Sequence, residues 1–216
     1  MAFDDKYQAG SPPSPVDCQP GVIISSDTER TERIPPGQVR TRKWPVLQAG
    51  GVANVDRDTW SLTVHGLVDS PMEWNLADFK TLPRVKVFSD FHCVTTWSRL
   101  GNLWEGVSST EILNRVGVQD SAKYVILTGH DNDWTTNLPL KEFRAIDALF
   151  ADTHDDHPID DDHGGPVRLV IPRLYAWKSA KWVKSVEFVA EDNAGYWERN
   201  GYHMNGDPWT EERFSK

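Results

Sequence analysis

The stretch Asp90-Phe91-His92-Cys93-Val94-Thr95-Thr96-Trp97-Ser98 places one cysteine beside a histidine in a run rich in aromatic residues. A thiolate is a soft metal ligand as well as a nucleophile, so Cys93 is a candidate reactive centre. Buried free cysteines are also common and inert. The stretch alone leaves both interpretations open, and the residues that follow in the chain decide between them.

Two later stretches have the features of an anion-binding site. The first, His163-Gly164-Gly165-Pro166-Val167-Arg168-Leu169-Val170-Ile171-Pro172, combines two glycines that let the backbone approach a ligand with an arginine whose planar fork suits phosphate. The second, Tyr175-Ala176-Trp177-Lys178-Ser179-Ala180-Lys181-Trp182-Val183, adds two lysines. Arg168 and Lys181 stand among apolar residues, where a partly buried cation requires an anionic partner.

In this order, HCVTTWS, HGGPVRLVIP and YAWKSAKWV resemble the molybdopterin-binding domain of the sulfite oxidase family. The chain is most similar to the small, haem-free bacterial and archaeal members, and the resemblance runs from about Arg40 to the C-terminus, including Gly195–His203. It implies a sulfite-oxidase-type α+β fold of mixed β-sheets with short helices. It also implies a molybdenum-molybdopterin (Mo-MPT) cofactor and oxygen-atom or two-electron transfer on a small molecule.

The resemblance assigns expected roles to individual residues. Cys93 would bind molybdenum through its thiolate sulfur. The pterin or its phosphate would be contacted by Thr128, His163, Arg168, Ser179, Ala180 and Lys181. Thr128 could instead be an ordinary strand-end hydroxyl, and His163 could be a histidine satisfied by the backbone of a tight turn.

The run Arg40-Thr41-Arg42-Lys43-Trp44-Pro45-Val46 departs from the family pattern, because a typical sulfite oxidase has an arginine followed by Asn-His here. Thr41 and Trp44 are its cofactor candidates. Arg42 could face an anionic substrate, and a basic lead-in to a strand is the alternative. The departure favours a reductase over a sulfite oxidase.

Four further residues are candidates for the substrate pocket, namely His92, Trp97, Trp134 and Tyr175. The Tyr175 hydroxyl could orient an oxyanion near the metal. The chain has 10 tryptophans, so any one aromatic residue could equally belong to the core.

Length and composition favour a single soluble enzyme domain. A chain of 216 residues with 38% hydrophobic content can bury a substantial core. The formal charge of −9 excludes a nucleic-acid or anionic-membrane surface outside local basic patches. No stretch has the roughly 20 apolar residues of a membrane helix. Cys18 and Cys93 make no disulfide framework, and no export signal is evident, so we expect a reducing, cytoplasmic location.

The pattern along the chain predicts an extended N-terminal arm over residues 1–38 and one oxidoreductase domain over residues 39–216. Short strands and helices follow each other irregularly, which is typical of an α+β domain. Strands are predicted at 60–68, 85–91, 124–129, 167–172 and 182–189, and helices at 75–80, 109–116 and 140–150.

Two other functions remain open. The acidic and histidine-rich run Asp152–His163 could bind a divalent ion, which would make the chain a metal-binding module; an acidic surface loop is the simpler interpretation. The second open function is that of a protein that carries molybdopterin without catalysing a reaction. If the chain is an enzyme, no cytochrome-like segment is attached, so we expect a separate electron-transfer partner.

Overall fold

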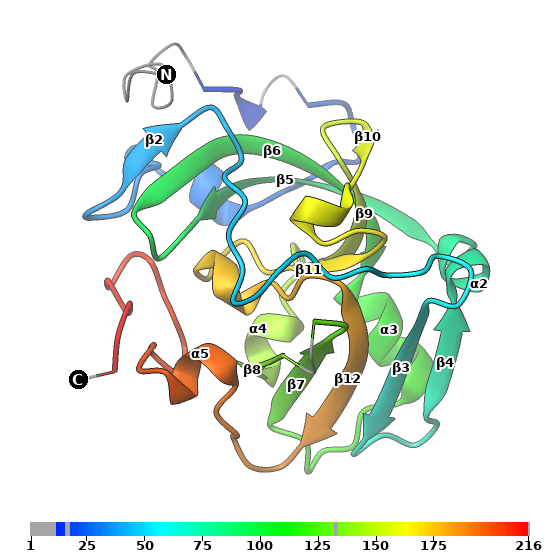
Figure 1. The fold of residues 1–216 in the computed structure, drawn as a ribbon. Helices are drawn as coiled ribbons and strands as arrows, with labels where there is room; N and C mark the ends of the chain where they lie inside the picture. The colour runs from blue at the N-terminus through cyan, green and yellow to red at the C-terminus, as the bar shows by residue number, and fades with distance from the viewer. Residues whose placement is uncertain (1–11, 16–17, 132–133, 216) are drawn as a thin grey trace.

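The computed structural model describes residues 12–15, 18–131 and 134–215, which form two β-sheets joined by short helices (Figure 1). The seven-stranded sheet contains β1 (Ile23–Ile24), β2 (Val39–Thr41), β5 (Arg84–His92), β6 (Trp97–Ser108), β9 (Leu149–His154), β10 (His157–Pro158) and β11 (Arg168–Val170). The five-stranded sheet has the order β4-β3-β12-β7-β8, from β3 (Ser61–Gly66), β4 (Met72–Asn75), β7 (Tyr124–Gly129), β8 (Thr135–Pro139) and β12 (Val183–Val189). Mixed sheets with few helices confirm the predicted α+β class.

The helices are all short. They are α2 (Leu76–Lys80), α3 (Ser109–Val116), α4 (Leu140–Phe143) and α5 (Tyr196–Arg199), with 3₁₀ turns η2 (Ser26–Glu29), η3 (Asp161–His163) and η4 (Ala176–Lys178). The side chain of Asn75 caps α2 by accepting from Asp78 N, and the hydroxyl of Ser108 caps α3 by accepting from Glu111 N. Both helices were predicted at these residues, α2 from its Asn75 cap, whereas the cap of α3 is the residue before the predicted run.

The predicted helix at 140–150 is wrong beyond its first turn. Helix α4 ends at Phe143, and Leu149 begins β9, which pairs with β6 on one side and with β11 on the other. Leu149 and Phe150 are fully buried between these strands. Long-range pairing therefore overrides a local pattern that could be read as helix.

The N-terminal segment is part of the fold from residue 23. Strand β1 pairs in parallel with β5, and Ser25 is fully buried with its hydroxyl donating to Asp147 at 2.7 Å. The predicted arm over residues 1–38 thus contributes an edge strand and buried polar contacts. Residues 1–11 and 16–17 lie outside the described residues.

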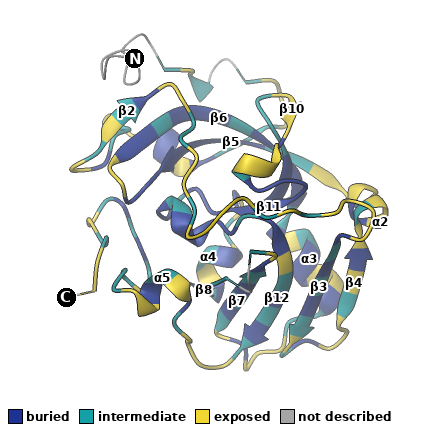
Figure 2. Ribbon diagram, viewed as in Figure 1, coloured by how far each residue is buried: buried dark blue, intermediate teal, exposed yellow. Residues whose placement is uncertain are grey.

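Buried side chains form two clusters, and the inner positions of β5, β6 and β12 are dark blue in Figure 2. The larger cluster packs α2 and α3 against the five-stranded sheet. The smaller contains Cys93, Trp97, Trp104, Tyr175 and Trp177. The core around Cys93 is therefore mainly aromatic.

We expect Gly106→Ala to destabilise the fold by about 3 kcal/mol, since overpacking a tightly packed interior costs energy. A Cβ at Gly106 would lie 1.9 Å from the Phe150 carbonyl oxygen, where β6 meets β9. The matched control is Gly51→Ala, where a Cβ meets nothing within 4 Å. Urea unfolding of both variants would measure the difference; equal midpoints would contradict this packing.

Candidate active site

Cys93 lies at the tip of the hairpin formed by β5 and β6. Thr96 N donates to Cys93 O at 3.0 Å, and Cys93 N donates to Trp97 O at 2.9 Å, so the four residues from Cys93 close a tight turn. Thr96 takes the left-handed conformation that this turn requires, with φ 74°. The prediction that a strand delivers Cys93 at its end is confirmed.

The Cys93 thiol is buried, and its hydrogen-bond partner among the described residues is the Thr95 hydroxyl, 3.2 Å from Sγ. Burial raises the pKa of this thiol above its ordinary value. The surrounding protein alone therefore favours the neutral thiol. A thiolate at this position needs further positive charge, which a bound metal ion supplies.

The Cys93 turn is fixed from two distant parts of the chain. Gln38 Nε2 donates to Cys93 O at 3.0 Å and to Trp97 O at 3.2 Å. Arg213 Nη1 donates to Val94 O at 2.8 Å, and Arg213 Nη2 donates to Gln38 Oε1 at 3.2 Å. These bonds satisfy turn carbonyls and hold the cysteine in one orientation.

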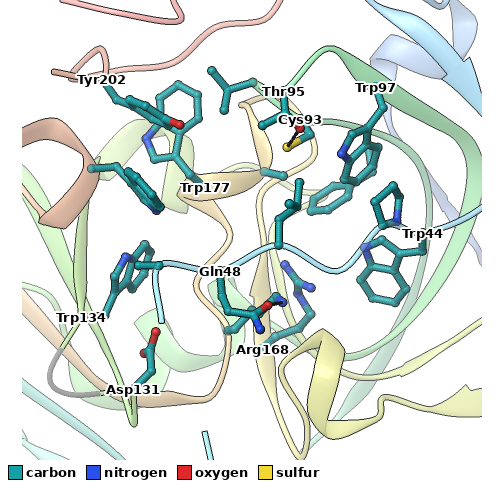
Figure 3. Close-up of a pocket in the computed structure, with 18 of the residues that line it drawn as sticks. Trp44, Gln48, Cys93, Thr95, Trp97, Asp131, Trp134, Arg168, Trp177 and Tyr202 are labelled. Carbon is teal, nitrogen blue, oxygen red and sulfur yellow. Dashed lines mark hydrogen bonds between the residues drawn. The ribbon is translucent and has the colours of Figure 1, made fainter. Parts of the chain in front are cut away.

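Cys93 opens into a cavity of about 190 Å³ (Figure 3). The lining residues are Trp44, Pro45, Leu47, Gln48, Ala49, Phe91, Cys93, Val94, Thr95, Trp97, Asp131, Trp134, Arg168, Ala176, Trp177, Lys181, Trp182, Trp197 and Tyr202. They come from the seven-stranded sheet, from the connection between β7 and β8, from the residues between β11 and β12, and from the C-terminal segment. The others belong to the segment between β2 and β3, which crosses in front of β11 in Figure 1. Of the predicted site residues, the cavity brings together Trp44, Cys93, Trp97, Trp134, Arg168 and Lys181.

Arg168 is a buried cation held by backbone carbonyls. Its Nη1 donates to His163 O at 2.7 Å and its Nη2 donates to Ser179 O at 3.0 Å. Its Cζ lies 5.3 Å from the Trp44 ring centroid. No carboxylate pairs with it among the described residues, and burial lowers the pKa of Arg168 to about 9. An anion in the cavity would supply the missing charge.

Two further titratable groups line the same cavity. Lys181 Nζ donates to Asp162 O at 2.7 Å and to Gln48 Oε1 at 3.2 Å. Burial, followed by the charge of Arg168, lowers the pKa of Lys181 to about 7. Burial raises the pKa of Asp131 to about 6, and its Oδ1 is buried with no hydrogen-bond partner in the described part of the chain. Asp131 was not among the predicted site residues.

His163 supports the cavity wall without lining it. Its ring stacks on Trp44 with centroids 4.0 Å apart, and its Nε2 lies 3.0 Å from Trp44 O. Its Nδ1 lies 2.7 Å from Asp160 Oδ1. His163 is thus engaged by a backbone carbonyl and a nearby carboxylate, as in the tight-turn alternative.

The structure places other candidates outside the cavity lining. Ser179 Oγ accepts from Ile171 N at 2.9 Å, and Ala180 O accepts from Leu169 N at 2.8 Å, so both residues shape the backbone around Arg168. Thr128 is a half-buried residue inside β7. Thr41 Oγ1 accepts from Lys43 N at 3.1 Å.

Arg42, Tyr175 and His92 also lie outside the cavity lining. Arg42 is exposed. Tyr175 is buried behind Trp177, with ring centroids 5.3 Å apart, and burial raises its pKa to about 12. His92 is buried, with Nδ1 2.8 Å from the Ser98 hydroxyl. The substrate-facing roles of Arg42 and Tyr175 therefore stay predictions, and the aromatic hydroxyl in the cavity lining belongs to Tyr202.

The glycines of the HGGPVR run allow close approach to protein atoms. A Cβ at Gly164, where φ is +104°, would lie 2.8 Å from Lys181 Cβ. A Cβ at Gly165 would lie 2.2 Å from Ile159 O. We expected these glycines to let the backbone approach a ligand. In the structure they instead let the backbone pack against Lys181 and Ile159.

Trp197 and Tyr202 in the C-terminal segment form an aromatic wall of the cavity. Neither residue was assigned a role from the sequence. Tyr202 stacks on Trp197 at 4.9 Å and meets Trp177 edge-on at 5.1 Å. Behind this wall, Glu198 Oε1 accepts from Lys178 Nζ at 2.7 Å and from Trp177 Nε1 at 2.9 Å. In the sequence, residues 195–203 were noted only as part of the family resemblance, which does not say what their side chains contact.

The acidic run 152–163 forms no metal cluster: within the described residues, no group of three or more His, Cys, Asp or Glu side chains could hold an ion. Asp152 binds Arg84, and Asp155 Oδ2 lies 2.6 Å from Arg99 Nη2. These carboxylates form ion pairs with arginines on β5 and β6 of the seven-stranded sheet. The divalent-ion interpretation gains no support.

A family model described as "Oxidoreductase molybdopterin binding domain" matches residues 49–197. The chain belongs to this family. It is 47% identical to the Uncharacterized oxidoreductase YuiH of Bacillus subtilis, over 87% of this chain and 95% of that protein. It is 29% identical to a putative protein-methionine-sulfoxide reductase subunit, YedZ1, of Azospira oryzae (83% of this chain, 69% of that protein).

More distant molybdopterin oxidoreductases agree with this assignment. The chain is 23% identical to the sulfite oxidase of Arabidopsis thaliana, over 72% of this chain and 48% of that protein. The sulfane dehydrogenase SoxCD of Paracoccus pantotrophus has the same fold, with a TM-score of 0.62 and 19% identity over 70% of this chain and 42% of that one. The resemblance to the sulfite oxidase family is confirmed, and with it the Mo-MPT cofactor.

The cavity residues of this molybdopterin oxidoreductase fit its cofactor. The buried Cys93 sulfur suits a soft metal at one side of the cavity. The Arg168 guanidinium, without a carboxylate partner in the described ranges, suits a phosphate. Trp44 and Trp182 line the cavity and offer aromatic surface to a flat ring. Asp131, with its unpaired oxygen, suits an N–H donor of the pterin.

We expect Arg168→Gln to lower retention of the pterin, since removing one partner of a buried charge pair costs on the order of 2–5 kcal/mol. Fluorescence of the oxidised pterin released from the purified protein measures its content. The matched control is Arg115→Gln on α3, which removes only an exposed ion pair with Glu111. Equal pterin content in both variants would contradict the phosphate role.

Cys93→Ser should have the complementary effect. The pterin should remain, because Arg168 and the aromatic walls are intact, while the electronic spectrum of the metal changes because its protein sulfur ligand is lost. Pterin content and the visible spectrum, measured on the same sample, separate the two ends of the cofactor. An unchanged spectrum with full turnover would make Cys93 a core thiol.

Proposed function

We propose that this molybdopterin oxidoreductase reduces a small, neutral S-oxide or N-oxide beside Cys93. In this reaction the S–O or N–O bond breaks, the oxygen takes up two protons and leaves as water, and sulfur or nitrogen gains two electrons. A separate electron-transfer protein, bound transiently, is the proposed source of those electrons. When bound, the cofactor supplies the redox-active metal.

One observation carries the direction of the reaction: the cavity around Cys93 is walled by aromatic rings. Trp97, Trp177 and Tyr202 surround Cys93 in Figure 3, whereas Arg168 lies across the opening from it. Of the cations in the described lining, Arg168 donates to the carbonyls of His163 and Ser179, and Lys181 donates to the carbonyl of Asp162. Arg213 holds the Cys93 turn by donating to Val94 O but does not line the cavity. An anion such as sulfite would need cationic donors near the metal, and a neutral oxide does not.

The position of Arg42 also supports a neutral substrate. Arg42 is the residue expected to face an anion, and it is exposed and outside the cavity lining. The similarity to a putative protein-methionine-sulfoxide reductase subunit agrees with an S-oxide substrate. We also infer a cytoplasmic location, which the two free cysteines support. No helix of the described chain has the length and apolarity to cross a membrane.

Steady-state assays of the loaded protein test this proposal. We expect turnover of dimethyl sulfoxide or trimethylamine N-oxide with reduced viologen, and little oxidation of sulfite with an electron acceptor. Arg42→Gln should leave the reduction unchanged. Brisk sulfite oxidation without oxide reduction, with a KM for sulfite that rises in Arg42→Gln, would reverse the direction. A loaded protein with no turnover of any oxide or of sulfite would be a carrier.

A further inference from the structure

The Trp97 indole nitrogen is a buried donor without a hydrogen-bond partner among the described residues. Trp97 is 5% exposed, lines the cavity, and begins β6 directly after the turn that carries Cys93. Burying an N–H group without an acceptor destabilises a protein, so such groups in native proteins usually meet a ligand or water. Figure 3 shows the nitrogen-bearing edge of Trp97 turned toward Cys93.

Tyr202 approaches the same part of the cavity from the other side. In Figure 3 its hydroxyl end points into the cavity, on the side of Trp177 and Thr95. Its ring is held by Trp197 and Trp177, and Tyr202 N donates to Trp197 O at 3.0 Å. Burial, followed by the nearby charge of Cys93, raises the pKa of Tyr202 above its ordinary value. The hydroxyl therefore stays protonated and able to donate.

We propose that Trp97 Nε1–H and Tyr202 O–H donate hydrogen bonds to the oxygen atom of the substrate and hold that oxygen beside Cys93. This inference rests on the proposed oxide reduction. The oxygen of an S-oxide or N-oxide carries much of the dipole of the molecule and accepts more than one hydrogen bond, while its methyl groups can pack on aromatic faces. Neutral donors suit such an oxygen without attracting free anions into the cavity.

A buried ion pair lies behind the aromatic wall that carries Tyr202. The ion pair between Glu198 and Lys178 is buried, and Glu198 also accepts from Trp177 Nε1, so α5 and the aromatic wall are fixed together. Tyr202 lies beyond residues 49–197, which the family model matches. We therefore assign substrate selection in part to the C-terminal segment, outside the matched domain.

Tyr202→Phe in the loaded enzyme tests the proposal, because it removes the hydroxyl and keeps the ring on Trp197. We expect kcat/KM for dimethyl sulfoxide to fall about 10- to 100-fold, the range for loss of one oriented donor to a reacting oxygen. Molybdenum and pterin content should stay unchanged. The matched control is Tyr196→Phe, since Tyr196 also contacts Trp197, at 5.1 Å, but does not line the cavity.

A second readout does not depend on turnover. Dimethyl sulfone, an unreactive oxygen acceptor, is added to the half-reduced enzyme, and the electron paramagnetic resonance signal of the metal is recorded. We expect the sulfone to perturb the wild-type and Tyr196→Phe signals and to leave Tyr202→Phe and Trp97→Phe nearly unaffected. If the enzyme oxidises sulfite and reduces no oxide, the proposed function fails, but loss of the sulfone effect in Tyr202→Phe would still support the donor. Equal responses in all variants would overturn it.

Discussion

The Arg168 guanidinium sits in an apolar interior with backbone carbonyls in place of a carboxylate, and much of the site is arranged around it. The carbonyls of His163 and Ser179 face inward to accept its N–H groups, which sets the path of the chain before and after β11. Its positive charge contributes to the low pKa of Lys181. The cavity therefore holds more positive charge than the surrounding protein neutralises, and an anionic ligand that enters it stabilises the folded state.

The opposite side of the cavity follows a different principle. Around Cys93 the cavity is lined by aromatic rings, and Gln38 and Arg213 fix the cysteine turn by donating to its carbonyls. One cavity thus combines a side that requires a bound anion with a side that tolerates a neutral molecule. This division matches a phosphate-bearing cofactor at one end and an uncharged substrate at the other.

The features predicted correctly from the sequence are those that depend on residues close together in the chain. Helix caps and helical spacing located α2 and α3, alternation located β3, and the end of β5 placed Cys93 correctly. The helix predicted at 140–150 failed because β9 exists only through its pairing with distant strands. Arg168 and Lys181 could be picked out from the sequence because both are cations among apolar residues. Buried cations are rare, since each needs a partner for its charge. The family resemblance supplied the cofactor, which no local pattern could.

Aromatic residues in irregular segments could not be placed from the sequence. Tyr175 and Tyr202 both lie in segments without a regular period, and only the packing of the C-terminal segment decides that Tyr202 lines the cavity. Asp131 gave no signal because an aspartate in a turn is ordinary. Its burial depends on segments distant in the chain.

The wall formed by Trp197 and Tyr202, and the clamp of Arg213 on the Cys93 turn, also determine an order of assembly. Cys93 is synthesised long before the residues that hold its turn and close its cavity. A nascent chain that has passed β12 carries Arg168 and Cys93 but has neither wall nor clamp. The cavity is therefore complete only after the C-terminal segment has been synthesised, because Trp197 and Tyr202 line it and Arg213 holds the Cys93 turn.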